Sequence, residues 1–322
     1  MTQSETDTDP GTEVPDPGAE APGADGTEVL GADGVPTGQA VLDRLVARLD
    51  LERIEVNLFR GVSPPESPPR VFGGQVAGQA LVAAGRTVPE EREVHSLHAY
   101  FIRPGDPTVP IVYEVERVRD GRSFTTRRVL AIQHGEAIFS LSASFQLPQP
   151  GLEHTEPMPE GIPGPRDLPD VGSRIVELGV PVGPFQRLPR PLDIRYVHDP
   201  VWLPGFTPTK EPMRVWMRAD GTLPDDKLLH VCVLTYASDL TLLNSVLARH
   251  EIPVRDEEVS RASLDHAMWF HQPFRADEWL LYECYSPVAS GARGLATGRF
   301  FTEDGRLVAT TVQEGLVRIA AH

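Results

Sequence analysis

The chain has 322 residues, 40% of them hydrophobic, and a formal net charge of −16 at pH 7. A chain of that length can bury one large core or two ordinary ones. The acidic balance argues against nucleic acid or an anionic membrane as the main partner, because both would repel the chain at long range.

Residues 1–36 are the most acidic part of the sequence. They contain nine Asp or Glu, no Lys or Arg, and many Pro, Gly, Ala and Thr. Such a segment cannot bury enough apolar area to offset the entropy lost on ordering, so we expect a disordered acidic tail. It has neither the basic nor the apolar region of a secretion signal, and no apolar run in the sequence has the length of a membrane span. We therefore expect a cytoplasmic protein.

Residues 37–146 begin with a glycine-rich helical pattern and continue as strands. The helix is expected over 71–88, VFGGQVAGQALVAAGRTV. Four strand-like runs follow, namely HSLHAYFIR, PIVYEVERVRD, SFTTRRVLAIQ and EAIFSLSASFQ, with the turn signals Pro-Gly at 104–105, Asp-Gly at 120–121 and His-Gly at 134–135 between them. Runs of this kind joined by short turns predict an antiparallel meander.

A second unit, residues 192–322, follows a proline-rich linker at residues 147–191. It repeats the same order, with a helix expected over 238–250, SDLTLLNSVLARH, and then the strands SLDHAMWFHQ, EWLLYECYSPV, GLATGRFFT and RLVATTVQEGLVRI. The two meanders also share the spacing between their last two turns. A helix followed by a long meander, twice, predicts an α+β fold of the double-hotdog type, with two antiparallel sheets each wrapped around a central helix.

Asp239 is notable because its neighbours in the sequence TYASDLTLLNSV are mostly apolar or small residues, and because the expected second helix begins there. Asp is a common helix cap, since its side chain accepts hydrogen bonds from the free N–H groups of a first turn. A carboxylate among apolar residues can also be tuned for acid–base chemistry. From this segment alone the cap is the favoured interpretation.

Seven motifs in order along both units carry a resemblance to the type II acyl-CoA thioesterases, from about residue 42 to 319: VFGGQVAGQALVAAGRTVPEE, VHSLHAYFIRPGD, VERVRDGRSFTTRRVLAIQHG, IFSLSASFQ, YASDLTLL, SLDHAMWFH and ATTVQEGLVR. The resemblance implies a double hotdog that hydrolyses acyl-CoA to fatty acid and CoA without a metal or organic cofactor. It also implies an Asp, Thr or Ser, and Gln site around a water, which falls on Asp239, Ser263 and Gln313. Ser263 stands where a related family member has Thr, and that exchange keeps the hydroxyl.

With the resemblance included, catalysis by Asp239 is favoured over capping alone. Free N–H groups of the helix expected after Asp239 are candidate donors to the oxyanion. The first unit has no carboxylate at its own helix start, residues 72–75, so we expect one chemical site per chain. We expect acyl-CoA as the substrate and a homo-oligomer as the assembly.

Two other functions stay open. The first is a non-catalytic acyl-CoA-binding or sensing protein with the same fold. The second is a hotdog-type enoyl-CoA hydratase, which the spacing of Asp225 and His230 suggests, although the Asn-Pro of the hydratase pattern is missing between them.

Several other residues carry weaker expectations. His98 and His266 occupy similar positions in the two units, which favours a shared structural role over base catalysis. Cys232 and Cys284 lie in strand-like apolar runs and are expected to be reduced core thiols that bind no metal. Three arginines are candidates for binding CoA phosphates or for a solvated strand face (Arg122, Arg127, Arg128). For three glycines, close packing of a helix on a sheet is favoured over contact with a ligand (Gly73, Gly74, Gly78).

Overall fold

The computed structural model describes residues 28–64, 69–181, 185–250 and 259–319. After α1 (Gln39–Leu49), the first unit contains one central helix and the strands around it, namely β3 (Glu52–Glu55), β4 (Leu58–Gly61), α2 (Gly73–Gly85), β5 (Glu93–Phe101), β6 (Ile111–Asp120), β7 (Phe124–Gln133) and β8 (Glu136–Gln146). The second unit repeats this order with β9 (Leu192–Tyr196), β10 (Met213–Ala219), α4 (Lys227–Ser238), α5 (Asn244–Leu247), β11 (Val259–Ser263), β12 (Asp265–Phe270), β13 (Leu280–Ser290), β14 (Arg293–Thr302) and β15 (Leu307–Ile319).

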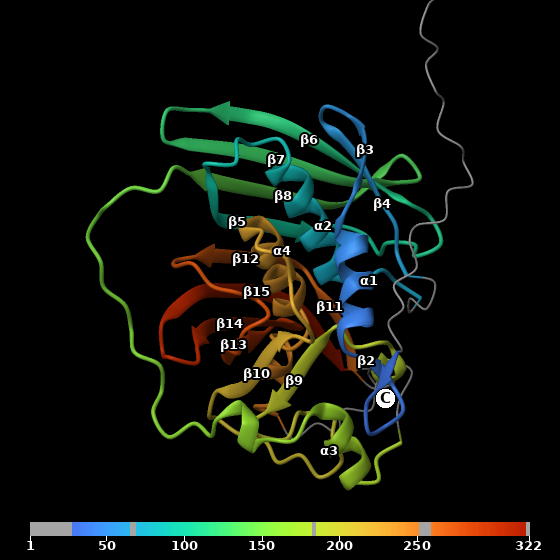
Figure 1. Cartoon of the computed structure of the whole chain (residues 1–322). Coiled ribbons are helices and arrows are strands. Elements are labelled where there is room, and N and C mark those ends of the chain that lie inside the picture. The colour runs from blue at the N-terminus through green and yellow to red at the C-terminus, as the bar shows by residue number, and fades with distance from the viewer. Residues whose placement is uncertain (1–27, 65–68, 182–184, 251–258, 320–322) are drawn as a thin grey trace, which may run out of the picture.

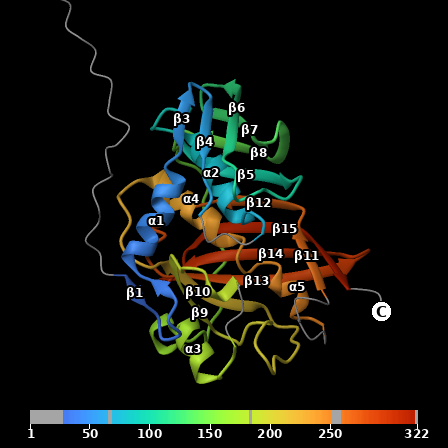
Figure 2. The same cartoon turned by 90° about the vertical axis from the view of Figure 1, so that its right-hand side faces the viewer.

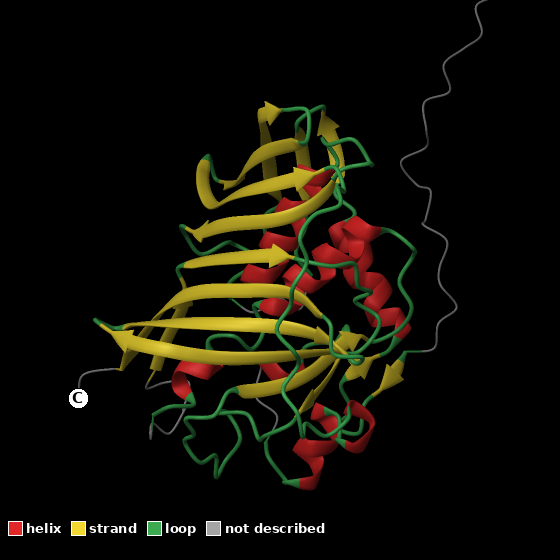
Figure 3. Ribbon diagram, turned by 90° about the vertical axis from the view of Figure 1, so that its left-hand side faces the viewer, coloured by secondary structure: helices red, strands yellow, loops and turns green. Residues whose placement is uncertain are grey.

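The two meanders share one topology. In the first unit the strands lie in the order β4-β6-β7-β8-β5, and in the second in the order β10-β13-β14-β15-β12. The double hotdog is therefore confirmed. Its two sheets join through the antiparallel pair β5 and β12 into one thirteen-stranded sheet, with the central helices α2 and α4 together on one side (Figures 1 and 3). This joint brings residues of both units to the same place.

The central helices α2 and α4 pack antiparallel against each other. A Cβ on Gly74 would overlap the carbonyl oxygen of Tyr236, and a Cβ on Gly85 would overlap Leu228. The start of α2 therefore meets the end of α4, as their neighbouring positions in Figure 2 indicate. The glycines of α2 were expected to pack a helix on a sheet, and that expectation is wrong for Gly74, since helix packs on helix there.

The helix predicted over 238–250 is also wrong in position. The helix that corresponds to α2 is α4, which ends at Ser238, and the later segment holds just the four-residue α5. The sequence of α4, KLLHVCVLTYAS, is apolar on all sides because the helix is buried between α2 and the sheet. A buried helix and a buried strand look alike at this length, so the periodicity could not identify it.

The end of the predicted acidic tail is ordered. Two short strands, β1 (Val29–Leu30) and β2 (Pro36–Thr37), pair with each other and lead into α1 (Gln39–Leu49). Asp33 accepts a hydrogen bond of 3.1 Å from Arg190, and both side chains are largely buried. The predicted boundary at residue 36 is therefore wrong for residues 28–36, because this ion pair ties them to the end of the proline-rich segment. Residues 1–27 lie outside the described residues.

The proline-rich segment does more than connect the two units. It contains α3 (Val171–Glu177), and its residues Met158, Ile162 and Leu168 pack on an apolar cluster formed by Trp216, Trp279, Leu281 and Phe301. Alternate residues of β10 and β13 point instead to the helix side. The segment thus covers the second face of these strands. None of the helices in the described ranges is long and apolar enough to cross a membrane.

Candidate active site

Asp239 follows directly on α4 and does not begin a helix. Its backbone N–H bonds to Ala237 within the last turn, so it is the C-terminal cap residue of α4. The N-terminal cap of that helix is Asp226, whose carboxylate accepts from Leu228 and Leu229. The expectation that Asp239 caps the start of a helix is wrong, because α4 ends just before it and the next helix, α5, begins at Asn244.

Asp239, Ser263 and Gln313 lie together although 74 residues separate the first from the last. Gln313 Nε2 donates to Asp239 Oδ1 at 2.7 Å and to Ser263 Oγ at 2.8 Å. Ser263 Oγ donates to the same Asp239 Oδ1 at 3.3 Å. The two neutral side chains thus both direct a proton at one carboxylate oxygen, which fixes the carboxylate in place.

Strand pairing brings the two neutral residues together. Ser263 ends β11 and pairs with Gly315 of β15, and the next residue, Leu264, donates its N–H to Glu314. Gln313 lies two residues before Gly315 and is fully buried, on the helix side of β15. Gly315 also allows Leu243 to approach closely, because a Cβ there would contact that side chain at 2.6 Å. The segment after Asp239 is thereby held onto β15.

Burial raises the pKa of Asp239 to about 6. The hydrogen bonds from Gln313, Ser263 and the backbone of Gly74 act in the opposite direction, because they stabilise the charged form. Burial is the larger effect. A carboxylate with this pKa is mostly ionised at neutral pH and still a useful proton acceptor.

The start of α2 completes the site from the other unit. A Cβ on Gly73 would stand 2.7 Å from Asp239 Oδ2 and 2.7 Å from the ring of Phe101. The N–H groups of Gln75 and Val76 both bond to Phe72, whereas the backbone N–H of Gly74, one residue into the helix, bonds to the carboxylate of Asp239. The sequence alone did not predict that Gly73 would lie against Asp239. A Gly-Gly pair at a helix start was the available signal.

Arg127 is a structural residue and does not face solvent. Its guanidinium is buried and donates to Thr87 and to Asp120, which ties the end of α2 to the turn between β6 and β7. It was a candidate for CoA phosphates, and that interpretation is wrong because its donors are already satisfied. Arg128 is exposed and paired with Glu116 at 2.8 Å.

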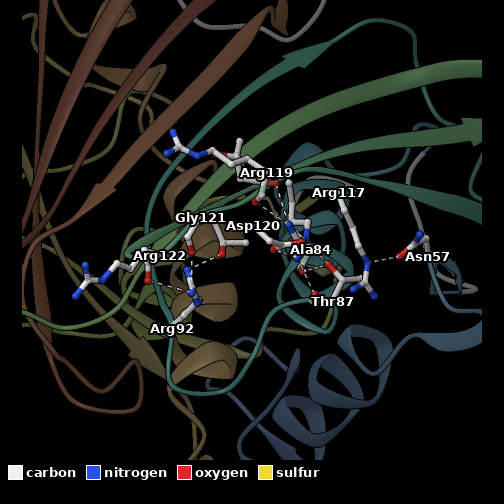
Figure 4. A network of polar contacts seen from close by, with 12 residues as sticks. Asn57, Ala84, Thr87, Arg92, Arg117, Arg119, Asp120, Gly121 and Arg122 are labelled. Carbon is white, nitrogen blue, oxygen red and sulfur yellow. Dashed lines mark hydrogen bonds and ion pairs between the residues drawn. The ribbon is translucent and has the colours of Figure 1, made fainter.

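Arg122 is the remaining candidate of the three. Its backbone oxygen accepts from Arg92, while its own side chain points away from the polar network in Figure 4. Arg92 also donates to Thr125 and Gly121, so it serves to hold the turn. The interpretation of Arg122 as a phosphate ligand stays a prediction.

The two histidines of the repeat do not share a role. His98 pairs with Ala267 and His266 pairs with Ala99, so the two rings point to opposite faces of the sheet. His98 is exposed and stacks edge to face on Trp269, whereas His266 is buried. The expectation that His98 and His266 occupy equivalent positions is therefore wrong, because the alignment of the two strands is shifted by one residue.

The pair suggested by hydratases does not form. His230 is buried in α4, where its Nδ1 accepts from the backbone of Ala276. Asp225 has an exposed side chain that pairs with Arg275. The two candidates have separate partners and make no joint site.

Both cysteines are free and buried, as expected, although Cys232 lies in α4 and not in a strand. Burial raises the pKa of each thiol. Among the described residues, no three His, Cys, Asp or Glu side chains gather to hold a metal ion. The expectation that the reaction needs no metal or organic cofactor stays a prediction.

A cavity of about 290 Å³ lies elsewhere, between α3, β9 and the segment 197–203. Trp202 and Tyr196 line it, but none of the three predicted site residues does. The catalytic role of Asp239, Ser263 and Gln313 stays a prediction, and this cavity is separate from them.

Comparisons with known proteins identify the family of the chain. Two family models match, "Acyl-CoA thioesterase" over residues 191–316 and "Acyl-CoA thioesterase N-terminal domain" over residues 63–146. The human acyl-coenzyme A thioesterase 8 is 41% identical over 300 residues, which cover 90% of this chain and 93% of the relative. The acyl-CoA thioesterase 2 of Haemophilus influenzae is 40% identical over 288 residues, 87% of this chain and 99% of the relative.

A solved structure gives the same result. The acyl-CoA thioesterase II of Mycobacterium marinum superposes with a TM-score of 0.71 and 46% identity, covering 86% of this chain and 98% of the other. The relatives match both units in order and almost end to end. This chain therefore belongs to the acyl-CoA thioesterase family.

Proposed function

We propose that this protein hydrolyses acyl-CoA thioesters to free fatty acid and CoA, with Asp239 as general base and with Ser263 and Gln313 as positioning partners. The observation that carries the proposal is the shared set of hydrogen bonds at Asp239 Oδ1, on a carboxylate whose pKa is about 6. Family membership supports the reaction, and this geometry supports the assignment of roles.

The carboxylate and the amide can hold one water between them. Asp239 Oδ1 accepts from both side-chain donors, and the backbone of Gly74 also donates to the carboxylate, so we assign Oδ2 to accept a proton from the water. Gln313 Oε1 is buried and has no partner among the described residues, so it can accept the second proton of the same water. A water that donates both protons presents a lone pair for attack.

The water oxygen then attacks the thioester carbonyl carbon while its proton passes to Asp239. We assign the negative charge that forms on the carbonyl oxygen to the start of α2, where the N–H group of Gly73 and the helix dipole would stabilise it, since the N–H group of Gly74 already bonds to Asp239. When the tetrahedral intermediate collapses, the carbon–sulfur bond breaks and the proton on Asp239 passes to the CoA thiolate. Fatty acid and CoA thiol leave, and Asp239 is again ionised.

A free-thiol release assay over acyl-CoAs from short to long chain length tests this proposal. Wild-type protein should release CoA thiol, and Asp239→Asn should lower kcat by about 10²–10⁴ with little change in KM, the range of a lost general base. Asp226→Asn is the matched control, because it changes an aspartate at the opposite end of α4 and Asn caps a helix about as well as Asp. Tight acyl-CoA binding without thiol release by the wild type would favour the non-catalytic sensor instead.

A further inference from the structure

Ser238, the residue before the proposed base, is buried and held through its hydroxyl. Its Oγ donates to the carbonyl oxygen of Thr235 at 2.9 Å and lies 2.8 Å from His266 Nε2. A hydroxyl has one proton, and here that proton goes to Thr235, so His266 Nε2–H must be the donor to Ser238. His266 on β12 thus fixes the last turn of α4.

The carbonyl group of Ser238 is held by Tyr282 of β13. The Tyr282 hydroxyl donates to Ser238 at 3.2 Å and lies 2.9 Å from Thr311 Oγ1. Because its single proton goes to Ser238, Tyr282 accepts from Thr311. Thr311 is two residues before Gln313 on β15, so both side chains point to the same face. One tyrosine therefore links the residue before Asp239 to the strand that bears Gln313.

Gly298 provides the space for this link. It lies on β14, between β13 and β15, and pairs with Cys284 on one side and Thr311 on the other. A Cβ on Gly298 would overlap both the ring of Tyr282 and Oγ1 of Thr311. The ring itself stacks on Phe300, with centroids 3.8 Å apart and planes 8° from parallel. The side chain of Tyr282 therefore crosses β14 at Gly298, where no side chain blocks its contact with Thr311 on β15.

Ser238 and His266 also form a close serine–histidine pair, but they do not fit nucleophilic catalysis. Both are buried, and the serine proton is already donated to Thr235. His266 Nδ1 has no partner among the described residues, whereas a catalytic histidine is oriented by a third group at that nitrogen. The pair therefore holds structure and does not attack substrate.

We propose that Tyr282, together with His266 and Thr311, positions Asp239 for catalysis by fixing the end of α4 relative to β15. The inference rests on the proposed function, because it assigns these residues to the placement of the base beside Gln313. The hydrogen bond from Gln313 to Asp239 spans 2.7 Å, and a shift of the helix end by about 1 Å can cost 10²-fold in rate. The hydrogen bonds of His266, Tyr282 and Thr311 hold Ser238, the last residue of α4, and so oppose a shift of the helix end.

Tyr282→Phe tests the proposal, because it keeps the ring stack and removes both hydrogen bonds. We expect kcat to fall by about tenfold or more with KM nearly unchanged, since substrate contacts remain. Tyr113→Phe is the matched control. Tyr113 is equally buried, and its hydroxyl donates to Gln79 at 2.7 Å in the unit that lacks the carboxylate. It should lose a similar amount of thermal stability and keep the kcat of the wild type.

Two variants of Thr311 keep the test decisive where Tyr282→Phe folds poorly. Thr311→Val preserves the shape and removes the donor, so kcat should fall, whereas Thr311→Ser keeps the hydroxyl and should restore most of it. The double variant Tyr282→Phe, Gln313→Ala should lose less than the product of the single losses, because both act on one arrangement. Wild-type kcat in Tyr282→Phe and Thr311→Val, beside an inactive Asp239→Asn, would overturn this inference alone. An active Asp239→Asn would overturn the proposed function as well.

Discussion

Asp239 of the second unit lies directly against Gly73 of the first, so close that a Cβ on Gly73 would stand 2.7 Å from Asp239 Oδ2. The proposed base and the helix start that faces it thus come from different halves of the chain. Antiparallel packing of α2 on α4 produces this arrangement, because it puts the N-terminus of one helix at the C-terminus of the other. The positive end of the α2 dipole lies beside the carboxylate, where it favours negative charge.

Gly73→Ala should therefore impair chemistry more than folding. The added methyl group would occupy the space beside Oδ2 and press on the ring of Phe101, so we expect kcat to fall by about 10²-fold, as for a misplaced reacting group. Gly78→Ala is the control in the same helix, where the new Cβ would meet Cys232 and Leu49 at 3.2 Å. Both variants should lower the melting temperature. An equal loss of kcat in the two would contradict a special role for Gly73.

The rate should depend on pH through the ionisation of Asp239. A general base acts in its ionised form, and burial raises the pKa of this carboxyl to about 6. We expect kcat/KM to fall tenfold for each pH unit below 6 and to level off above pH 7. The profile is measured with an acyl-CoA whose thiol release is quantified after the reaction is stopped. In Gln313→Ala the apparent pKa should rise, because a hydrogen bond that stabilises the ionised form is lost.

The same pKa predicts a cost in stability at neutral pH. The carboxyl of Asp239 binds its proton more tightly in the folded protein, with a pKa of about 6, than at its usual value of 3.8. Its contribution to stability is therefore fully present below pH 4 and is lost as the pH rises through 6. Asn does not ionise, so Asp239→Asn should be more stable than wild type at pH 8 by about 1–3 kcal/mol. Denaturant unfolding at pH 8 and pH 4 measures this gain, which should vanish at the lower pH.

The meanders were predictable because strand-like runs are joined by short turns that contain Gly, at Gly121 and Gly135 in the first unit and at Gly291 and Gly305 in the second. The helix of the second unit was not, because α4 is apolar on every side and its neighbours were unknown. The oxyanion donors were therefore sought in a helix that does not begin at Asp239, whereas the proposed donor, Gly73, belongs to a helix that packs against α4 from the other unit.

The three site residues were identified by resemblance and not by their local patterns. Ser263 and Gln313 are ordinary strand residues in sequence, and their contact depends on the pairing of β11 with β15. Sequence periodicity contains no information on that register across 50 residues. The positions of His98 and His266 show the same limit, since a shift of one residue reverses the face of a strand.

Deletions at the N-terminus should separate residues 1–27 from residues 28–36. The first segment contains no Lys or Arg and no apolar periodicity, so its removal should leave the melting temperature unchanged. Removal of residues 1–36 also removes Asp33 and leaves Arg190 largely buried without that partner, at a cost of roughly 3 kcal/mol. Asp33→Asn in the full chain should reproduce much of that loss. Both shortened proteins should keep the kcat of the wild type, because neither deletion touches Asp239.

The last prediction concerns how Asp239, Ser263 and Gln313 share the work. Ser263→Ala and Gln313→Ala should each lower kcat by less than Asp239→Asn does, because Asp239 can still deprotonate a water that is poorly oriented for attack. Ser263→Thr should keep most activity, since the hydroxyl that donates to Asp239 is retained. Groups that act on one water work as a unit, so adding Gln313→Ala to Asp239→Asn should lower kcat by much less than the product of the single effects. Fully multiplicative losses in that double variant, measured by thiol release under saturating acyl-CoA, would show that Gln313 acts on something other than the water at Asp239.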